Sequence, residues 1–418
     1  MQQKPLVCTI SKFPPYMSGH SFEAMNQGRG LFEITGYKHY EVTYDPEAYD
    51  KSVNYNDSPD LIKYSKKYLN VNQVGASSLK NSKVLEGELM KAFIGKIINL
   101  IEQKDINVLS TFYLDPHAYF ANQAKFYAKN VLGKRIVTAH KAVGSDVLNS
   151  MGTHLGDGQS KFLLNEFLSG DLIFAVSEYT RKKIVEYAYS VLPKKAASEL
   201  EARLQVLYPP FENEFFAIRD EEMISGLKKK YRIREGSQIL SYFGRLFPEK
   251  GVDDLLLAYL EIKKLFPKTF LVIGGYGIEM NNLKLRAREI GLSDYKFAGA
   301  VSDHEKRAIM QMSDLGIIPT KPIKNFVETL CISALEYQAS GCLLLTTKVG
   351  GVPEAGGEHS LYAKHSEPAD LAKKISLVLE GKVRREERVQ KGLTHVAKFN
   401  YRKITERFLD LVNEKLNG

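Results

Sequence analysis

The sequence predicts an α/β protein built from two doubly wound domains. Short, almost continuously apolar segments rich in β-branched residues alternate with longer segments whose apolar residues recur at helical spacing. Strands of this kind are buried on both faces, so they are typical of parallel sheets covered by helices. The pattern occurs in both halves of the chain, and 418 residues exceed what one hydrophobic core usually holds.

Each half has its own set of predicted strands. Those of the first half are residues 5–10, 106–112, 135–140 and 171–176, and those of the second half are 238–244, 269–275, 314–319 and 342–347. Helices are predicted between them at residues 84–103, 179–192, 252–266, 281–291 and 367–381. This alternation is what βαβ units require.

The boundary between the domains is predicted at the tandem prolines in the segment 207–215, because proline neither continues a helix nor suits a central strand. We therefore expect an N-terminal domain over 1–210 and a C-terminal domain over 211–399. The amphipathic end of the chain, 400–418, is expected to complete the first domain. Residues 46–83 are polar and outside the pattern, which predicts an insertion or long loop on the N-terminal domain.

Composition limits the classes of function. Hydrophobic residues make up 44% and charged residues 26% of the chain, and no run approaches the roughly 18 apolar residues of a membrane span. Cys8, Cys331 and Cys342 are too few and too scattered for a disulfide framework, and the N-terminus has no signal-peptide pattern, so we expect a cytoplasmic protein. The net charge of +9 suits an anionic partner, such as a nucleotide diphosphate or an anionic membrane face, or simply a solvated surface. The basic clusters lack interleaved aromatic residues, so nucleic acid is not an expected partner.

Glycines follow three predicted strands of the second half. Gly244 ends one strand and is followed by Arg245 and Lys250; Gly275 ends the next, and Gly350-Gly351 follow a third. Ligands of open parallel sheets bind along the carboxyl ends of the strands, so these loops can converge on one ligand. Glycine lets backbone approach closely, and two fixed cations beside a helix start would hold a diphosphate.

Two glutamates, Glu328 and Glu336, lie eight positions apart around a predicted helix start. Eight helical residues rise about 12 Å, which is of the order of the distance from a sugar through a diphosphate to a ribose. Carboxylates accept hydrogen bonds from sugar hydroxyls, and the N–H groups of Thr329, Leu330 and Cys331 would face the phosphates. From spacing alone, the simpler explanation is that Glu328 is an acidic residue near a helix start and that Glu336 lies on a solvated helix face.

The pair resembles the E-x7-E signature of the retaining family 4 glycosyltransferases. Further segments that resemble the family are FPPYMSGHSFE, RIVTAHKAVGSD, AVSEYTR, LYPPF, GRLFPEKG, LVIGGYG, YKFAGAVSDHE and VGGVPE. The resemblance implies the GT-B fold, in which two Rossmann-like domains face each other across a cleft. It implies transfer of a sugar from a nucleotide-diphosphate sugar to a hydroxyl of a glycan, glycolipid precursor or small molecule. The favoured donor is a UDP-sugar. No metal and no cofactor beyond this co-substrate are implied, and a peripheral contact on the cytosolic side of a membrane is compatible with it.

The resemblance also implies roles for individual residues. Arg245 and Lys250 would stabilise charge on the departing diphosphate, Glu328 would orient the donor sugar, His140 would contact that sugar from the N-terminal domain, and Glu336 would hold the ribose. The implied donor-binding residues further include Gly19, Gly244, Gly275, Gly299, Thr329, Leu330 and Cys331.

The chain departs from the family at the first glutamate, where Glu328-Thr329-Leu330-Cys331 replaces the usual E-G-F-G. The bulkier backbone puts the identity of the donor sugar in doubt. An epimerase or phosphorylase on the same fold, or a non-catalytic nucleotide-sugar-binding module, remains an alternative. Asp115-Pro116-His117 could suggest a metal pair, but no third ligand stands nearby in the sequence.

Overall fold

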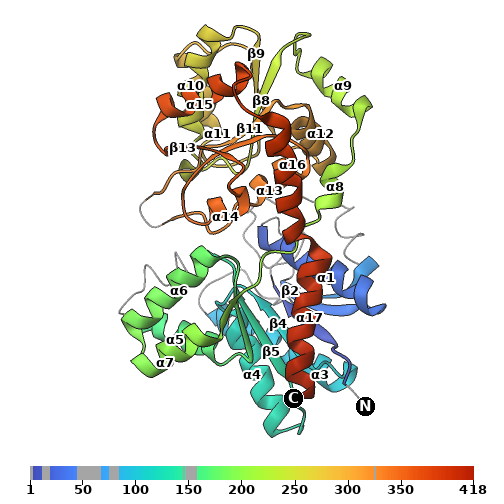
Figure 1. The fold of residues 1–418 in the computed structure, drawn as a ribbon. Helices are drawn as coiled ribbons and strands as arrows, with labels where there is room; N and C mark the ends of the chain where they lie inside the picture. The colour runs from blue at the N-terminus through green and yellow to red at the C-terminus, as the bar shows by residue number, and fades with distance from the viewer. Residues whose placement is uncertain are drawn as a thin grey trace. The chain divides into compact units, whose positions relative to one another are not determined.

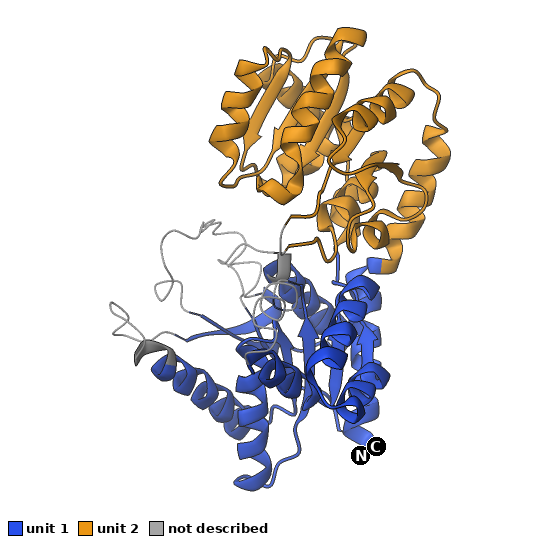
Figure 2. Ribbon diagram, turned by 90° about the vertical axis from the view of Figure 1, so that its left-hand side faces the viewer, with its two compact units in different colours: residues 1–211, 399–418 blue, residues 212–398 orange. Residues whose placement is uncertain are grey.

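The computed structural model describes residues 3–11, 19–44, 67–74, 84–144, 146, 158–323 and 326–418. The chain divides into two compact units (Figure 2). Unit 1 comprises residues 1–211 and 399–418, and unit 2 comprises residues 212–398. Each unit contains a parallel sheet with helices on both faces (Figure 1). The predicted α/β class with two parallel sheets is confirmed.

The sheet of unit 1 has seven strands in the order β3-β2-β1-β4-β5-β6-β7. Its strands are β1 (Val7–Ile10), β2 (His39–Tyr44), β3 (Leu69–Val74), β4 (Val108–Phe112), β5 (Val137–Ala142), β6 (Leu172–Ala175) and β7 (Leu204–Val206). The strand order reverses between β1 and β4. Such a switch point leaves a crevice at the carboxyl ends of the strands, where doubly wound sheets bind ligands.

Helices cover both faces of this sheet. They are α1 (Gly19–Thr35), α3 (Val84–Lys104), α4 (His117–Asn130), α5 (Gln159–Leu168), α6 (Glu178–Val191), α7 (Lys194–Arg203) and α17 (Tyr401–Asn417). Phe93 of α3 and Phe120 of α4 pack on one face in a core with Ile10 of β1. On the other face, α17 lies beside α1, and the hydroxyl of Tyr401 donates to Glu33 at 2.7 Å. The end of the chain is thus part of the core of unit 1.

The sheet of unit 2 has six strands in the order β10-β9-β8-β11-β12-β13. Its strands are β8 (Gln238–Phe243), β9 (Thr269–Gly274), β10 (Tyr295–Gly299), β11 (Leu315–Ile318), β12 (Leu344–Thr347) and β13 (Leu361–Ala363). Its helices are α8 (Asn213–Ala217), α9 (Glu221–Lys230), α10 (Val252–Leu265), α11 (Met280–Glu289), α12 (Asp303–Met312), α13 (Ile332–Ala339), α14 (Val352–Gly356), α15 (Pro368–Leu379) and α16 (Arg385–Val396). Every strand pairing is parallel, so the loops after the strands gather along one edge.

Part of the range 46–83 is regular. Residues Leu69–Val74 form β3, which pairs with β2 along its length at the edge of the sheet, so the expectation of a loop was wrong for this segment. The sequence LNVNQV places polar residues at alternate positions and lacks the continuous apolar run that marks the inner strands. Most of the remaining insertion lies outside the described residues.

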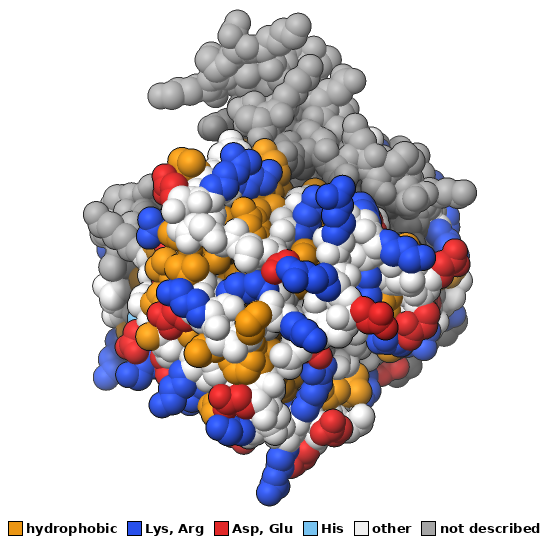
Figure 3. Space-filling view, turned by 90° about the horizontal axis from the view of Figure 1, so that it is seen from above, with side chains coloured by type: hydrophobic (Ala, Val, Ile, Leu, Met, Phe, Trp, Pro, Cys, Tyr) orange, Lys and Arg blue, Asp and Glu red, His pale blue; other side chains and the backbone are white. Residues whose placement is uncertain are grey.

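Charge is spread over the surface. Figure 3 shows Lys and Arg side chains scattered between apolar and uncharged areas of one face, and they do not gather into a single basic patch. Among the helices of the described residues, none has the length and apolar content needed to cross a bilayer.

Candidate active site

The loops after β8, β9 and β10 are joined at the carboxyl edge of the unit 2 sheet. The Gly244 N–H donates to the Gly274 carbonyl at 3.3 Å, and the Gly275 N–H donates to the Gly299 carbonyl at 2.8 Å. The Leu246 N–H donates to the Tyr276 carbonyl at 2.9 Å. Backbone hydrogen bonds therefore bring the predicted donor-binding glycines Gly244, Gly275 and Gly299 into one assembly.

The close packing of these loops also explains why glycine is required in them. Gly275 has φ +119°, and a Cβ atom there would lie 1.8 Å from the carbonyl oxygen of Gly244. A Cβ on Gly277 would lie 2.2 Å from the carbonyl oxygen of Leu246. We expected glycine to let the backbone approach a ligand, and here it lets neighbouring loops approach each other.

Gly350 and Gly351 support the loop that carries Glu328. The Gly351 N–H donates to the Glu328 carbonyl at 2.8 Å. Cβ atoms on Gly350 and Gly351 would lie 2.1 Å and 1.8 Å from the carbonyl oxygens of Glu328 and Thr329. Any side chain at these positions would displace the backbone of the first signature glutamate.

Arg245 presents its charge to solvent. Its side chain is 61% exposed and lies 3.9 Å from the Glu249 carboxylate. Its guanidinium stacks over the ring of Phe247 at 4.9 Å from the ring centroid, and its carbonyl accepts a hydrogen bond from the buried Tyr242 hydroxyl. Backbone and side chain are thus both held, which leaves the exposed guanidinium oriented for an anion.

Lys250 and Glu328 form a direct ion pair, although 78 positions separate them in the chain. Their side chains are only 11% and 13% exposed. Lys250 ends a short 3-10 turn (Pro248–Lys250), and Gly251 follows with φ +65° at the start of α10. The structure therefore brings together the residue expected at the phosphates and the residue expected at the transferred sugar.

Glu336 is held by a lysine that the sequence did not single out. Lys306 of α12 places its Nζ 2.8 Å from Glu336 and 2.9 Å from Asp303. Burial alone would lower the pKa of Lys306, but the two carboxylates outweigh it and raise that pKa, so the ammonium stays charged. Ser302 is the N-cap of α12 and forms a capping box with Glu305. This capping box is readable in the sequence, and it sets the start of α12 and therefore the position of Lys306 in its first turn.

Helix α13 begins later than the sequence suggested. We expected it from about Thr329, whereas it starts at Ile332, because Cys331 has an extended backbone with φ −96° and ψ 97°. The estimate of about 12 Å between the two glutamates assumed continuous helix and does not apply here. Leu330 and Cys331 are buried, and burial together with nearby Glu328 raises the pKa of the Cys331 thiol to about 12. Cys331 is therefore a packing residue with an unreactive thiol.

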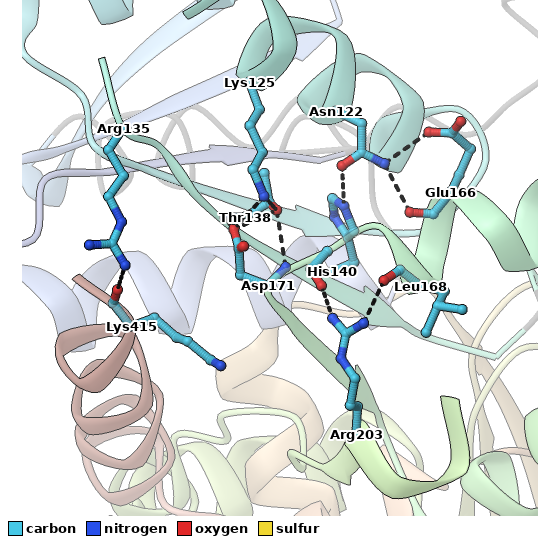
Figure 4. Close-up of polar contacts among 11 residues, drawn as sticks. Asn122, Lys125, Arg135, Thr138, His140, Glu166, Leu168, Asp171, Arg203 and Lys415 are labelled. Carbon is cyan, nitrogen blue, oxygen red and sulfur yellow. Dashed lines mark hydrogen bonds and ion pairs between the residues drawn. The ribbon is translucent and has the colours of Figure 1, made fainter. Parts of the chain in front are cut away.

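In unit 1, Gly19 is the first residue of α1, and residues 12–18 of the expected N-terminal loop lie outside the described part of the chain. His140 is buried in β5 with both ring nitrogens engaged. Its Nε2 lies 2.9 Å from Asn122 Oδ1 and its Nδ1 lies 3.0 Å from Thr111 Oγ1. Figure 4 shows Asn122 between His140 and Glu166, to which the Asn122 amide donates twice.

This network sets the protonation of His140. Because the Asn122 NH2 group is directed at Glu166, its oxygen faces the imidazole, so Nε2 carries the hydrogen and Nδ1 accepts from Thr111. Burial, assisted by nearby Lys125, lowers the pKa of His140 to about 3. In this conformation His140 is a neutral residue inside unit 1, and both its nitrogens are used by the protein.

A buried ion pair near His140 was missed by the sequence reasoning. Lys141 projects to the opposite side of β5 from His140 and pairs with Glu23 of α1, with side chains 4% and 5% exposed. Lys141 also donates to the Tyr208 carbonyl at 3.2 Å. Burial raises the pKa of Glu23 and lowers that of Lys141, while their mutual attraction opposes both shifts. Glu23 lies within a quoted motif, but only the fold reveals its partner.

Comparison with known proteins agrees with this geometry. Residues 224–394 match the family model described as "Glycosyl transferases group 1". Unit 2 therefore contains a domain of this group, glycosyltransferase family 4. Over 152 residues the chain is 32% identical to a glycogen synthase of Mycobacterium tuberculosis, covering 36% of each chain. Over 187 residues it is 30% identical to a GDP-mannose-dependent alpha-(1-6)-phosphatidylinositol monomannoside mannosyltransferase of the same species, covering 44% of this chain and 46% of that protein. The match thus spans less than half of either family 4 relative.

Solved structures show the fold over the whole chain. A glycosyltransferase from Rickettsia africae aligns with a TM-score of 0.72 at 15% identity, covering 100% of both chains. Anabaena HepE in complex with UDP aligns with a TM-score of 0.74 at 14% identity, covering 99% of this chain and 100% of that one. The GT-B fold expected from the family 4 resemblance is confirmed.

Proposed function

We propose that this protein is a retaining glycosyltransferase that moves a sugar from a nucleotide-diphosphate sugar to a hydroxyl of a glycan, glycolipid precursor or small molecule. The observation that carries the proposal is the Lys250–Glu328 ion pair beside the exposed Arg245, at the carboxyl edge of a parallel sheet. Cations at this edge suit a diphosphate, and a carboxylate beside them suits the hydroxyls of the attached sugar.

Each residue then has a defined task. Arg245 and Lys250 stabilise the negative charge that grows on the diphosphate as the glycosidic bond breaks. The amino end of α13 contributes the positive end of its dipole. Glu328 orients the sugar, and Glu336, fixed by Lys306, accepts hydrogen bonds from the ribose hydroxyls. This chemistry needs no protein nucleophile.

The task of His140 is a proposal that depends on a change in its surroundings. The family resemblance gives it a contact with the donor sugar, yet both ring nitrogens are bonded within unit 1. A contact through Nε2 would require the Asn122 bond to break. The variants His140→Ala and Asn122→Ala together test this step. If His140 contacts the donor, His140→Ala lowers kcat whereas Asn122→Ala retains it. If His140 only supports unit 1, both variants lower Tm and neither lowers kcat.

A uridine base is the first choice for the donor. The solved structure of Anabaena HepE with UDP-glucose supports it, whereas the mannosyltransferase relative is named for GDP-mannose. Thermal-shift titration with UDP, GDP and their sugars, followed by mass spectrometry of products with candidate acceptors, tests both the base and the reaction. Stabilisation by a nucleotide sugar together with a new glycosylated product is the expected result.

A non-catalytic nucleotide-sugar-binding module is the second candidate. The observation that favours it is the segment Thr329-Leu330-Cys331, in which half-buried Thr329 and buried Cys331 replace the two glycines usual in the family. Slow hydrolysis of the donor in the absence of acceptor would exclude this alternative. An epimerase or phosphorylase on the same fold can be distinguished from a transferase by activity assays, because only the transferase requires a second, sugar-accepting substrate.

A further inference from the structure

A polar groove of about 500 Å³ lies in unit 1, between helix α3, the edge strand β3 and its neighbour β2. Its volume is within the range of small-ligand sites. Among the described residues that line it, several carry amide or ammonium groups and none carries a carboxylate. A groove of this composition is an unusual feature beneath a helix that covers a sheet, because such a space is normally filled by apolar side chains.

The strand side of the groove is polar because of the register of β3. Leu69 and Val71 join the apolar cluster on the α1 face of the sheet. Since side chains alternate along a strand, Asn70 and Asn72 project to the opposite face, where they line the groove with Tyr40 of β2. The Asn72 side chain donates to the Asn70 carbonyl at 2.9 Å, which holds the amide in place.

The helix side presents a matching stripe. Lys96, Asn99, Gln103 and Lys104 of α3 follow one another at helical spacing and all line the groove. On its inner face α3 supplies Phe93, Ile97, Leu100 and Ile101 to the apolar core. The polar stripe lies beside this apolar face, so the last turns of α3 present a positively charged surface at the rim of the core.

The position of the groove separates it from the catalytic edge. It uses residues from the first halves of β2 and β3 and the last turns of α3. Ligands of doubly wound sheets bind at the carboxyl ends of the strands, so the substrates of the proposed reaction would lie at the other end of this sheet. The groove is thus a separate feature that the transfer reaction does not explain.

We propose that this groove is a secondary binding site for an anionic saccharide, a sugar unit bearing a carboxylate or phosphate. The carboxamides of Asn70, Asn99 and Gln103 each offer donors and an acceptor, which matches the hydroxyls of a sugar. Lys96 and Lys104 supply positive charge without an opposing carboxylate in the lining. Such a site would hold a glycan on unit 1 independently of the nucleotide sugar. Its existence does not depend on the proposed reaction, because binding is measured without catalysis.

The test is isothermal titration calorimetry of the full chain with tetragalacturonate, and with maltotetraose and inorganic phosphate as separate probes. We expect saturable binding of tetragalacturonate and much weaker binding of the other two. The double variant Lys96→Glu with Lys104→Glu should weaken tetragalacturonate binding at least about tenfold, since charge-assisted hydrogen bonds contribute on this scale. Lys91→Glu is the matched control for the single variants Lys96→Glu and Lys104→Glu, because it makes the same charge change on α3 outside the groove and should leave binding unchanged.

Four results would overturn the proposal, and three of them come from the titrations already described. Those three are no saturable binding of tetragalacturonate, equal weakening by Lys91→Glu, and phosphate binding as tight as that of the saccharide. Asn99→Ala removes one exposed amide without a charge change. It therefore keeps the test informative if the double variant does not fold. It should also weaken saccharide binding, and an unchanged affinity in folded Asn99→Ala and Lys104→Glu proteins would likewise refute the site. Donor binding in unit 2 is measured separately with UDP, so failure of the two proposals can be told apart.

Discussion

Replacement of Lys306 by methionine should separate support of the active site from contact with substrate. In the structure Lys306 bonds to Glu336 at 2.8 Å and to Asp303 at 2.9 Å, and the Lys306 and Glu336 side chains are 19% and 12% exposed. Lys306→Met leaves the mostly buried Glu336 carboxyl without this partner. Removing one partner of a buried pair costs about 3–5 kcal/mol, and the remaining exposure places the expected loss near the lower end, about 3 kcal/mol.

Substitution of Glu336 itself should behave differently. In Glu336→Ala, Lys306 keeps Asp303, so the expected loss of stability is smaller, about 1–2 kcal/mol. If Glu336 holds the ribose, the same variant loses a hydrogen bond to a charged group, and donor KM should rise about 10- to 100-fold. The value of kcat should change little, because the ribose lies away from the breaking bond. Glu336→Gln should fall between wild type and alanine.

The assay combines calorimetric Tm with steady-state kinetics at varied donor concentration. Lys230→Ala is the control, because Lys230 pairs with Glu305 of the same helix α12 at 2.7 Å but is 58% exposed. Exposed pairs contribute about 0–1 kcal/mol, so this variant should keep both Tm and donor KM. A lowered Tm with unchanged donor KM in Glu336→Ala would refute the ribose contact and leave Glu336 as a purely structural partner of Lys306.

Three other substitutions test separate features. Arg245→Ala should keep Tm, since the side chain is 61% exposed, and should lower kcat/KM by about 10- to 100-fold; unchanged turnover would remove Arg245 from the diphosphate site. Burial raises the pKa of Glu41 well above its ordinary value. The unfolded chain therefore releases this proton at a lower pH than the folded protein does. As the pH rises from the ordinary pKa toward the raised one, the free energy of unfolding falls. Glu41→Gln, neutral at every pH, should therefore raise Tm at about pH 7–8 and give no gain near about pH 4, and a pH-independent difference in calorimetry would contradict this. Gly275→Ala should lower Tm by far more than Gly291→Ala. Both glycines have a positive φ, but only at Gly275 would the new Cβ meet backbone, 1.8 Å from the Gly244 oxygen. Equal shifts in Tm would show that only the backbone conformation matters.

The sequence predicted most inner strands because their burial is continuous, but it missed the inner strand β2, whose sequence HYEVTY mixes polar and apolar residues. β8 and β9 read as unbroken apolar runs, and both are buried along almost their whole length. Edge strands carry no such signal. β10 is only partly buried, and β3 alternates apolar and polar residues over just four positions before Gln73 breaks the pattern, so neither has the continuous apolar run that marked the predicted strands.

The sequence named the residues of the candidate site but gave no information on how they pair. Arg245 and Lys250 follow a strand-end glycine, which is a local signal. The contact between Lys250 and Glu328 joins loops far apart in the chain, and no spacing in the sequence encodes it. Lys306 was missed because a lysine on an amphipathic helix is usually solvated, and only the packing of α12 beside α13 turns it toward Glu336.

These pairings explain how two carboxylates can stand at a site proposed for a diphosphate. An unpaired glutamate near the phosphates would repel them, and in a partly buried site that repulsion is weakly screened. Here each signature carboxylate is neutralised by a lysine, Glu328 by Lys250 and Glu336 by Lys306. The cation left facing solvent is Arg245. On the proposed function, the field that an incoming nucleotide meets is therefore positive, while the two glutamates keep lone pairs for hydroxyl groups. Selection between a sugar nucleotide and a free diphosphate would then depend on hydrogen bonds to the glutamates, because attraction to Arg245 is common to both ligands.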